Sequence, residues 1–333
     1  MKAFIKAIEY YLPEKTLSND DLAELFPEWN AKKIAKKTGI SIRHIAAENQ
    51  TATDMAVKAA EKLFSKNPDL KSRVNFVLFC TQSPDYKLPT SACIIQHRLG
   101  LSTDIGALDF NLGCSGFVYG LSLAKSLIIS NQAQNVLLLT AETYTKYCHE
   151  KDKGNRSIFG DGAAATLIST DGVAEIENFV FGTDGSGEEN LKVKTGGARF
   201  PEKTNEFGFD DGGYVKSPDY LYMNGPEIFN FTLDVVPPLV DKTLKINNLK
   251  KEDINKFVFH QANKYMLETL RQVLDVEEGK FYINLSNSGN TVSSTIPIAL
   301  KNYIDCEKII ENQNVMVAGF GVGLSFAACV LKN

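Results

Sequence analysis

The sequence predicts an α/β protein made of two doubly wound halves that pack face to face. Short apolar runs typical of buried strands alternate with amphipathic helical runs along the 333 residues. The second half repeats the βαβ order of the first. Two similar segments, Asn111-Leu-Gly-Cys-Ser-Gly116 and Asn284-Leu-Ser-Asn-Ser-Gly289, also precede helices at corresponding places. We therefore predict an N-terminal half over residues 1–172 and a C-terminal half over residues 173–333.

The elements of the first half follow from apolar spacing and from helix caps. The predicted strands are short, mostly apolar runs: residues 4–10, 74–81, 105–110 and 136–140. The predicted helices have helical spacing or a recognisable start or stop: residues 18–25, 31–37, 51–64, 90–97 and the stretch that follows Cys114. Gly39 is the predicted stop of the lysine-rich second helix, and the prolines of residues 82–89 predict a loop.

The second half repeats this alternation after a less regular middle. The polar segment 149–156 predicts a loop, the small residues of 159–166 allow close backbone packing, and 183–220 predicts a long surface excursion. The predicted helices are residues 227–244, 263–274 and 292–303. The predicted strands are residues 256–260, 315–318 and 325–331.

Composition argues against several classes of function. The chain has 36 Lys and Arg against 40 Asp and Glu, a net charge of −4, which gives no global attraction to nucleic acid or to an anionic membrane. Charges interrupt the N-terminal apolar stretch, so an export signal is not expected. Glycines divide the apolar run 315–331, which favours two strands over a membrane span. We therefore expect a cytoplasmic protein without membrane or nucleic-acid partners.

The cysteines give no sign of a metal or disulfide framework. There are six, at positions 80, 93, 114, 148, 306 and 329, and none forms a C-x-x-C pair. Most lie in apolar segments. This pattern predicts reduced thiols, with neither disulfides nor a zinc site.

Cys114 is the strongest candidate for chemistry because it lies where a predicted strand meets a predicted helix. Gly113, Gly116 and Gly120 leave room for another backbone or a ligand to approach. The dipole at the first helical turn favours thiolate over thiol by about 0.3–1 kcal/mol when exposed and up to about 2 kcal/mol when partly buried. The alternative is a structural cysteine, because free cysteine is among the most buried residue types.

Two further side chains lie at joints of the second half. Of the four histidines, His97 falls in a predicted helix and His149 in a charged loop, whereas His260 ends an apolar strand at a turn. Such turns are where α/β sheets place ligand groups, although a satisfied core histidine is the alternative. Asn290 follows glycine at another joint, where a turn or cap is the usual role.

Several short motifs occur in one order along the chain. They are Thr38-Gly39-Ile40 with Arg43-His44-Ile45-Ala46, Thr81-Gln82-Ser83-Pro84-Asp85, Cys114-Ser115-Gly116-Phe117, Phe159-Gly160-Asp161-Gly162, His260-Gln261-Ala262-Asn263, Gly289-Asn290-Thr291 and Gly319-Phe320-Gly321-Val322-Gly323. Together they resemble the β-ketoacyl-acyl carrier protein synthase III family over nearly the whole chain. The resemblance implies a thiolase-like fold, with two pseudo-repeated doubly wound halves packed as a five-layered α-β-α-β-α core.

The resemblance also implies an acyltransferase that acts by decarboxylative Claisen condensation. Cys114 would accept an acyl group from an acyl-coenzyme A primer, and His260 and Asn290 would complete a Cys-His-Asn triad. The amides of Cys114 and Val322 would form the oxyanion hole. Malonyl-acyl carrier protein would supply the nucleophilic carbon, giving a β-ketoacyl-acyl carrier protein in fatty acid biosynthesis. No cofactor is implied beyond the coenzyme A thioester substrate, and a homodimer is expected.

Other residues are implied to line the route to Cys114. They are Lys37, Lys153, Gly225, Phe229, Asn263 and Phe320 along the tunnel and its mouth, Leu88 in the primer pocket, and Lys33 and Lys264 against the carrier protein. Lys33 stands where the family often has tryptophan, and Lys37 and Lys153 where it has arginine. Lysine cannot stack or form a bidentate fork as those residues do, so we expect coenzyme A to be held differently.

Two alternatives remain at the level of sequence. Some relatives of the family use the acyl-cysteine to make polyketide, quinolone or surface-sugar precursors. The changes at Lys33 and Lys153 keep such an acyltransferase role open. A non-catalytic scaffold of the same fold is the other alternative, against which the presence of Cys114, His260 and Asn290 argues. The lysine-rich helix itself is either a solvated face or a contact for a phosphate or an acidic partner.

Overall fold

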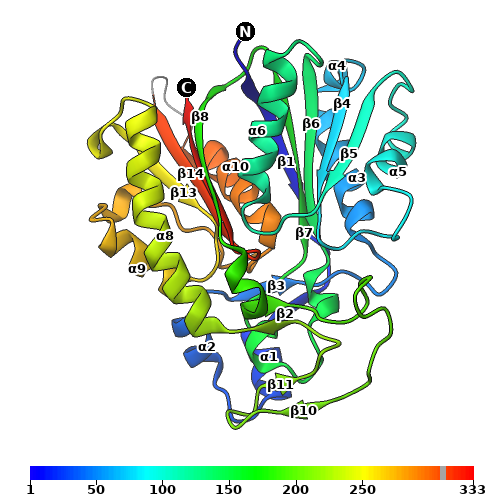
Figure 1. Cartoon of the computed structure of the whole chain (residues 1–333), viewed down its shortest axis with the longest axis vertical. Coiled ribbons are helices and arrows are strands. Elements are labelled where there is room, and N and C mark those ends of the chain that lie inside the picture. Colours follow the sequence, from blue (N-terminus) through cyan, green and yellow to red (C-terminus); the bar gives the residue numbers. More distant parts are fainter. Residues whose placement is uncertain (308–312) are drawn as a thin grey trace.

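The computed structural model describes residues 1–307 and 313–333 and contains one large sheet covered by helices (Figure 1). Across the described residues the sheet has nine strands in the order β13-β14-β15-β8-β1-β7-β6-β4-β5. Their bounds are β1 Phe4–Tyr11, β4 Phe76–Cys80, β5 Gly106–Phe110, β6 Asn135–Glu142, β7 Gly162–Ser169, β8 Ala174–Thr183, β13 Lys256–Phe259, β14 Asn314–Gly321 and β15 Ser325–Lys332.

The chain also forms α-helices and minor strands outside the large sheet. The α-helices are α1 Asn19–Leu25, α2 Ala31–Thr38, α3 Ala52–Lys66, α4 Pro68–Lys71, α5 Ser91–Arg98, α6 Gly116–Ile129, α7 Lys153–Arg156, α8 Gly225–Ile246, α9 Lys264–Val273 and α10 Thr295–Glu307. The minor strands are β2 Thr16–Ser18, β3 Ile42–His44, β9 Leu191–Lys192, β10 Gly208–Phe209, β11 Val215–Lys216 and β12 Tyr222–Met223.

The two halves of the strand order repeat one pattern of strand pairing. On one side β4 pairs parallel with β5 and β6, and antiparallel pairs then join β6, β7 and β1. On the other side β13 pairs parallel with β14, and antiparallel pairs join β14, β15 and β8. A parallel bridge between Phe257 and Phe281 occupies the place of β5. Two residue pairs, Phe4 with Glu175 and Ile5 with Ala174, link the two ladders through β1 and β8.

Helix contacts arrange the fold in five layers. Helices α3 and α5 cover one side of the first ladder, and α8 with α9 covers the far side of the second. Between the ladders lie α6, which contacts strands of both, and α10, which contacts β1, β7 and β13 (Figure 1). This confirms the predicted α/β class and its α-β-α-β-α order. The proposed boundary at residues 172 and 173 stays a prediction.

Local sequence explains where helices begin and end. Ser18 caps α1 in a capping box with Asp21, and Thr51 caps α3 in the same way with Asp54. Gly39 ends α2 with a φ of 72°, a left-handed conformation that glycine adopts without a Cβ clash. These starts and stops agree with the sequence predictions.

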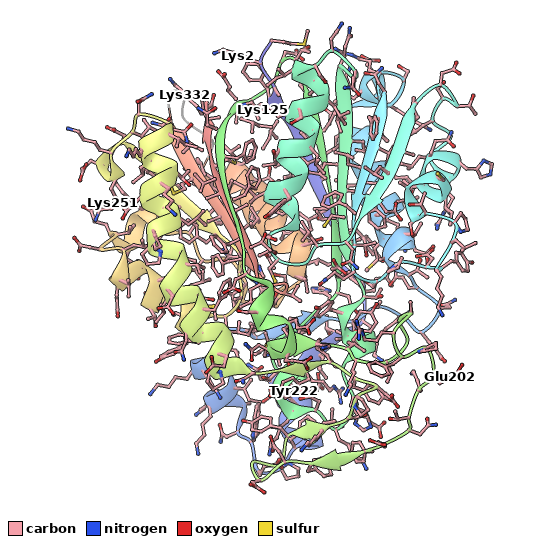
Figure 2. All side chains as sticks on the ribbon, in the orientation of Figure 1. Lys2, Lys125, Glu202, Tyr222, Lys251 and Lys332 are labelled. Carbon is pink, nitrogen blue, oxygen red and sulfur yellow. The ribbon has the colours of Figure 1, made fainter. Side chains whose placement is uncertain are left out.

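The central buried layer holds the two ladders together. Phe117, Leu121 and Ile128 of α6 pack with Ile296 of α10 and with strand residues of both ladders, including Val317. Side chains fill the space between the layers, whereas Lys2, Lys251 and Lys332 lie at the periphery (Figure 2). Burying apolar area in this way stabilises the fold by roughly 25 cal/mol per Å². No helix among the described residues combines the length and apolarity needed to cross a membrane.

Three features differ from the sequence predictions. The segment 149–156, expected to be a loop, contains the short helix α7, which Asp152 caps through the Asn155 amide. Strands β7 and β8 are not predicted from the sequence, since β7 is a run of small residues and β8 is only partly buried. The excursion 183–220 contains the minor strands β9, β10 and β11.

Candidate active site

Cys114 lies in the tight joint between β5 and α6. Cys114 directly precedes Ser115, the N-cap residue of α6, and only 7% of the surface of Cys114 is exposed. The Gly116 amide donates to the Gly113 carbonyl at 2.8 Å, which turns the chain into α6. The Ser115 hydroxyl is 2.7 Å from the hydroxyl of Ser325 on β15, so the second half also holds this joint.

The end of β14 packs against Cys114 so closely that only glycine fits. A Cβ atom at Gly321 would lie 2.8 Å from the Cys114 sulfur, and one at Gly319 would lie 2.6 Å from the Cys114 carbonyl oxygen. Across the joint, a Cβ at Gly113 would lie 2.6 Å from Val322 Cγ1. These glycines bring the Val322 backbone and the nucleophile joint together.

Burial keeps Cys114 a thiol in the free protein. Desolvation, with a smaller contribution from the Glu142 carboxylate, raises the pKa of Cys114 to about 12, although backbone groups of Cys114 and Val322 lower it. The preference for thiolate expected at the helix terminus is smaller than this effect of burial. The terminus supplies at most about 2 kcal/mol, which is less than the cost of burying a thiolate.

His260 is a buried, neutral imidazole directly after β13. Its amide donates to the Ala318 carbonyl at 2.8 Å, and its ring meets that of Phe320 edge-on, with centroids 5.8 Å apart. Burial lowers the pKa of His260 to about 3. Its Nε2 atom has no hydrogen-bond partner among the described residues.

Thr295, the first residue of α10, is the hydrogen-bond partner of Nδ1 of His260. Its hydroxyl lies 2.7 Å from Nδ1 of His260 and 3.0 Å from the Val292 carbonyl oxygen. A hydroxyl has one hydrogen, so it donates to only one of these acceptors at a time. When it donates to Nδ1, the neutral imidazole carries its proton on Nε2 and can donate there, whereas donation to the Val292 carbonyl leaves the proton on Nδ1.

Asn290 is held in place by hydrogen bonds of its backbone and of its side-chain oxygen. Its amide donates to Ile158 O and its carbonyl accepts from the Gly160 amide, both at 3.0 Å. The side-chain Oδ1 accepts from the Val292 amide at 2.9 Å, as in the turn role weighed from the sequence. This fixes the side chain and leaves its Nδ2 group without a hydrogen-bond partner in the part of the chain that the structure describes.

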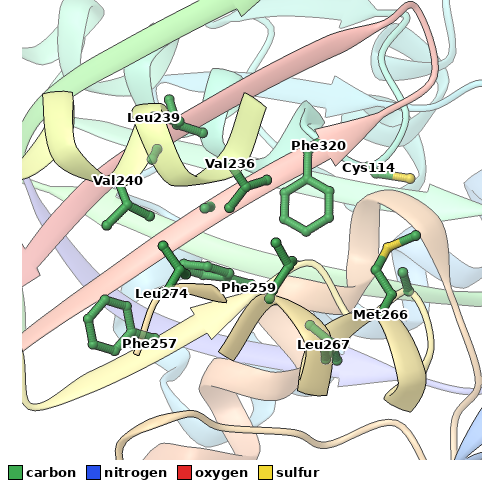
Figure 3. Packing of buried hydrophobic residues seen from close by; sticks show 14 of the residues in the cluster. Cys114, Val236, Leu239, Val240, Phe257, Phe259, Met266, Leu267, Leu274 and Phe320 are labelled. Atoms are coloured by element: carbon green, nitrogen blue, oxygen red, sulfur yellow. The ribbon is translucent and has the colours of Figure 1, made fainter. Parts of the chain in front are cut away.

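Phe320 contacts His260 and shares a buried cluster with Cys114. The same cluster contains Phe159 and Val292. Figure 3 shows Phe320 and Cys114 within it. Phe159 forms a bridge with Asn290. The structure therefore places all three candidate residues next to members of one cluster, while their roles as a triad stay a prediction.

Glu142 is a buried carboxyl group that the sequence analysis missed. It ends β6 and accepts hydrogen bonds from Ser83 Oγ and Ser293 Oγ, both at 2.9 Å, and from the Gln82 amide at 3.0 Å. Burial raises the pKa of Glu142 to about 8, against the effect of these donors. A glutamate at the end of a largely apolar strand is the sequence signal that could have identified it.

The residues predicted to form the tunnel and its mouth lie farther out. Lys33 and Lys37 are exposed on α2, whereas Lys153 pairs with Glu28 at 3.3 Å and is largely covered. Asn263 caps α9 by accepting from the Met266 amide, and Lys264 beside it is exposed. These placements test none of the binding roles.

Three other residues predicted to contact the substrates, Gly225, Phe229 and Leu88, lie in different surroundings. Gly225 begins α8 with open space beside it. Phe229 stacks on Tyr265 with ring centroids 5.5 Å apart. Leu88 is 81% exposed in the loop before α5, so within this one chain it faces solvent.

A groove of about 1040 Å³ lies away from these residues. It runs between α2, α9 and the segment 278–288, and Lys264 is the predicted site residue that lines it. Cys114, His260 and Asn290 do not line it. Within residues 1–307 and 313–333, no three His, Cys, Asp or Glu side chains gather as metal ligands would.

Comparison with known proteins gives family matches in both halves. The family model described as 3-Oxoacyl-[acyl-carrier-protein (ACP)] synthase III matches residues 108–185, and its C-terminal counterpart matches residues 244–333. The chain is 34% identical to the Beta-ketoacyl-[acyl-carrier-protein] synthase III of Chlamydia caviae, over 99% of this chain and 97% of the relative. It is 36% identical to the enzyme of that name from Clostridium perfringens strain 13, over 97% and 96% of the two chains.

Solved structures agree with these matches. A crystal structure of a 3-oxoacyl-(acyl-carrier-protein) synthase III superposes with a TM-score of 0.98 at 48% identity, over all of both chains. The structure of the beta-ketoacyl-[acyl carrier protein] synthase III from Thermus thermophilus has a TM-score of 0.87 at 32% identity, over 99% of each chain.

Proposed function

Because the chain belongs to the β-ketoacyl-acyl carrier protein synthase III family, it is a condensing acyltransferase of fatty acid biosynthesis, and we propose that Cys114, His260 and Asn290 carry out its chemistry. The observation that carries this assignment is the pair of neutral donors available in the second half. Asn290 Nδ2 lacks a described partner, and burial lowers the pKa of His260, so its imidazole is uncharged at neutral pH.

The first step transfers the acyl group of acyl-coenzyme A to Cys114. The sulfur forms a bond to the thioester carbonyl carbon, the bond from that carbon to the coenzyme A sulfur breaks, and the Cys114 proton ends on the departing thiolate. The amides of Cys114 and Val322 would stabilise the transient oxyanion. Both backbone groups already lower the pKa of the Cys114 thiol, which is the effect expected of donors directed at that position.

The second step uses malonyl-acyl carrier protein. Its terminal carbon–carbon bond breaks, carbon dioxide leaves, and the electron pair forms an enolate whose oxygen needs hydrogen-bond donors. Asn290 Nδ2 and the Nε2–H of His260 would supply them. The enolate carbon then attacks the acyl-cysteine carbonyl, and collapse releases the Cys114 sulfur and a β-ketoacyl-acyl carrier protein. Decarboxylation itself generates the carbanion, so an uncharged histidine suffices.

The remaining residues are proposed to guide the two substrates. Phe229, Asn263, Gly225 and Phe320 would line the pantetheine route, and Leu88 would act on primer length. Lys33, Lys37, Lys153 and Lys264 would meet the nucleotide or the acidic carrier protein, for which lysine charges are adequate. We also propose that the active form is a cytoplasmic homodimer, without a bound cofactor.

Mass spectrometry of intact protein tests the proposed function. After incubation with a panel of acyl-coenzyme A esters, we expect one acyl group on Cys114, located by peptide mapping. Addition of malonyl-acyl carrier protein should discharge it and give the β-ketoacyl product. Acylation without that product would instead identify a different acyltransferase, and the absence of acylation would argue for a scaffold.

A further inference from the structure

The turn that carries Asn290 is packed between two segments of the first half. On one side lies segment 157–160, which accepts a hydrogen bond from the Asn290 amide and donates one to the Asn290 carbonyl, both at 3.0 Å. On the other side, the Ser41 and Ile42 amides at the start of β3 donate to the Ser286 carbonyl at 2.8 and 3.0 Å. This turn of the second half therefore takes its position from the first half.

Arg43, the middle residue of β3, fills the space between the turn and segment 157–160. Its side chain is fully buried. A Cβ atom at Gly289 would lie 3.1 Å from Arg43 Cγ, and one at Gly160 would lie 3.4 Å from Arg43 Cβ. The arginine stem thus lies against both the residue before Asn290 and the segment that binds the Asn290 backbone.

The guanidinium group of Arg43 holds the start of that segment. Its Nε donates to the Ser157 carbonyl at 3.0 Å, and Nη2 donates to the same oxygen. Nη1 donates to the side-chain oxygen of Asn19, the first residue of α1. Ser157 directly precedes Ile158, whose carbonyl accepts from the Asn290 amide. The planar fork of arginine therefore fixes the residue next to the one that binds Asn290.

The guanidinium is charged but has no anionic partner in the part of the chain that the structure describes. Burial lowers the pKa of Arg43 to about 10, which still leaves the group protonated at neutral pH. Removing such a charge from water without a carboxylate partner costs free energy. An uncharged side chain could fill the same space without that cost. The arrangement therefore indicates precise placement of Ser157 rather than a gain in stability.

A displacement of segment 157–160 would reach the turn directly. A Cβ at Gly160 would lie 2.6 Å from the Ser288 carbonyl oxygen, so the two backbones are already in contact. The Asn290 side chain accepts from the Val292 amide within the same turn, so its Nδ2 group moves with the turn. A donor to a developing oxyanion loses much of its effect when it is misplaced by about 1 Å.

We propose that Arg43 is a positioning residue for condensation and that it acts through Asn290. This inference rests on the proposed function, since it assumes that Asn290 donates to the enolate. The guanidinium holds Ser157, the segment after Ser157 holds the Asn290 backbone, and the Nδ2 group is thereby aimed. Acylation of Cys114 does not use this donor and is therefore independent of Arg43.

Replacement of Arg43 should separate the two steps of the reaction. In Arg43→Met, which fills similar space without donors, condensation of preformed acyl-enzyme with malonyl-acyl carrier protein should fall about 10–100-fold. Arg43→Lys, which keeps the charge and one donor group, should lose less. Acylation by acyl-coenzyme A should stay within a few-fold of the parent in both variants. Arg98→Met is the matched control and should behave as the parent, because Arg98 joins α5 to α3 through Asp54 at 2.7 Å.

A double-mutant cycle separates this role from a general structural one. In the Asn290→Ala background, Arg43→Met should lower condensation no further, because the donor that it positions is gone. The same fold loss in both backgrounds would overturn the proposal. An equal loss of acylation and condensation in Arg43→Lys would also overturn it.

Gly160→Ala tests the same contact if Arg43→Met does not fold. The new Cβ would press on the Ser288 carbonyl, so condensation should fall while acylation is retained. Condensation at the parent rate in both Gly160→Ala and Arg43→Lys would overturn the proposal. Condensation at the parent rate in Asn290→Ala would instead contradict the proposed function, so the two failures are distinguishable.

Discussion

The two joints that feed the central helices occupy equivalent places in the repeated topology but differ in length and chemistry. In the first half, β5 ends at Phe110 and α6 begins at Gly116. In the second half, the bridge at Phe281 takes the place of β5, and the chain continues through Asn290 to α10, which begins at Thr295. The first joint carries a buried thiol, and the second carries an amide group whose donor has no partner among residues 1–307 and 313–333.

This difference indicates how one repeated fold can divide a reaction between its halves. The short joint packs Cys114 against β14 and suits a single reactive sulfur. The longer one has room for turns, including left-handed conformations at Gly289 and Val292 with φ values of 69° and 55°, and these aim Asn290 and support its carbonyl group. Covalent chemistry is then assigned to the first half and enolate stabilisation to the second.

Replacement of the thiol should produce the largest effect. Cys114→Ala removes the only atom proposed to hold the acyl group, so acylation should disappear and condensation should fall on the order of 10⁴-fold or more. Intact-mass measurement and a product assay check both steps. Cys93→Ala, which changes an exposed cysteine, is the control and should behave as the parent. Acylation that persists in Cys114→Ala would place the nucleophile elsewhere.

A change in the second joint should separate the two steps. Asn290→Ala removes one proposed enolate donor and should lower condensation by about 10²–10³-fold, the usual effect of losing such a donor. The acylation rate should stay within a few-fold of the parent, because Cys114 and its amide donors are unchanged. Rapid-quench measurement of acyl-enzyme formation, beside steady-state product formation, compares them. A proportional loss of both rates would contradict the division between the halves.

Sequence reasoning identifies the joints because local signals mark them. Glycines flank Cys114, His260 ends an apolar run, and Gly289 precedes Asn290, so each joint is visible within a few residues. The alternating runs likewise predict the α/β class and most of the elements. Strands β7 and β8 escape prediction because small or half-buried residues lack a distinctive period.

The contacts that tune the joints depend on distant segments. The pKa of Cys114 depends on burial under Gly319 and Gly321, more than two hundred residues away in sequence, and local dipole reasoning alone therefore misses the net direction of the shift. The roles of Glu142 and Thr295 can be recognised only from hydrogen-bond partners that folding brings close to them. A single sequence gives the residue types at a joint but not the electrostatic environment around them.

The support for His260 gives a smaller, sharper test. Thr295→Val removes the hydroxyl that lies 2.7 Å from Nδ1 and should lower condensation about tenfold, since a buried polar atom loses its partner. Acylation should change less, and Thr295→Ser should restore the parent rate because it keeps the hydroxyl. Nitrogen NMR shifts of His260 report the tautomer directly. Equal behaviour of the valine and serine variants would remove Thr295 from this role.

Glu142 connects the two joints. Its replacement should give the smallest of the predicted effects, a change in the pH dependence of stability. Its bonds to Ser83 and Ser293 tie the loop before α5 to the turn before α10. The pKa of Glu142 is raised to about 8 in the folded chain, above its ordinary value of 4.5. Between these values the folded state binds the extra proton, so stability is fully present below about pH 4.5 and is lost as the pH rises through 8.

Glu142→Gln should therefore flatten this part of the stability profile. The pKa of Asp161 is raised only to about 6 and that of His260 is lowered to about 3, so both contribute mainly below pH 6.5. Melting temperatures measured from pH 6.5 to 8.5 should fall more in the parent than in Glu142→Gln. Glu188→Gln, which changes an exposed carboxylate, should follow the parent. Parallel curves for parent and Glu142→Gln would show that the joints are not coupled through this carboxyl group, and the two halves would then tune their chemistry independently.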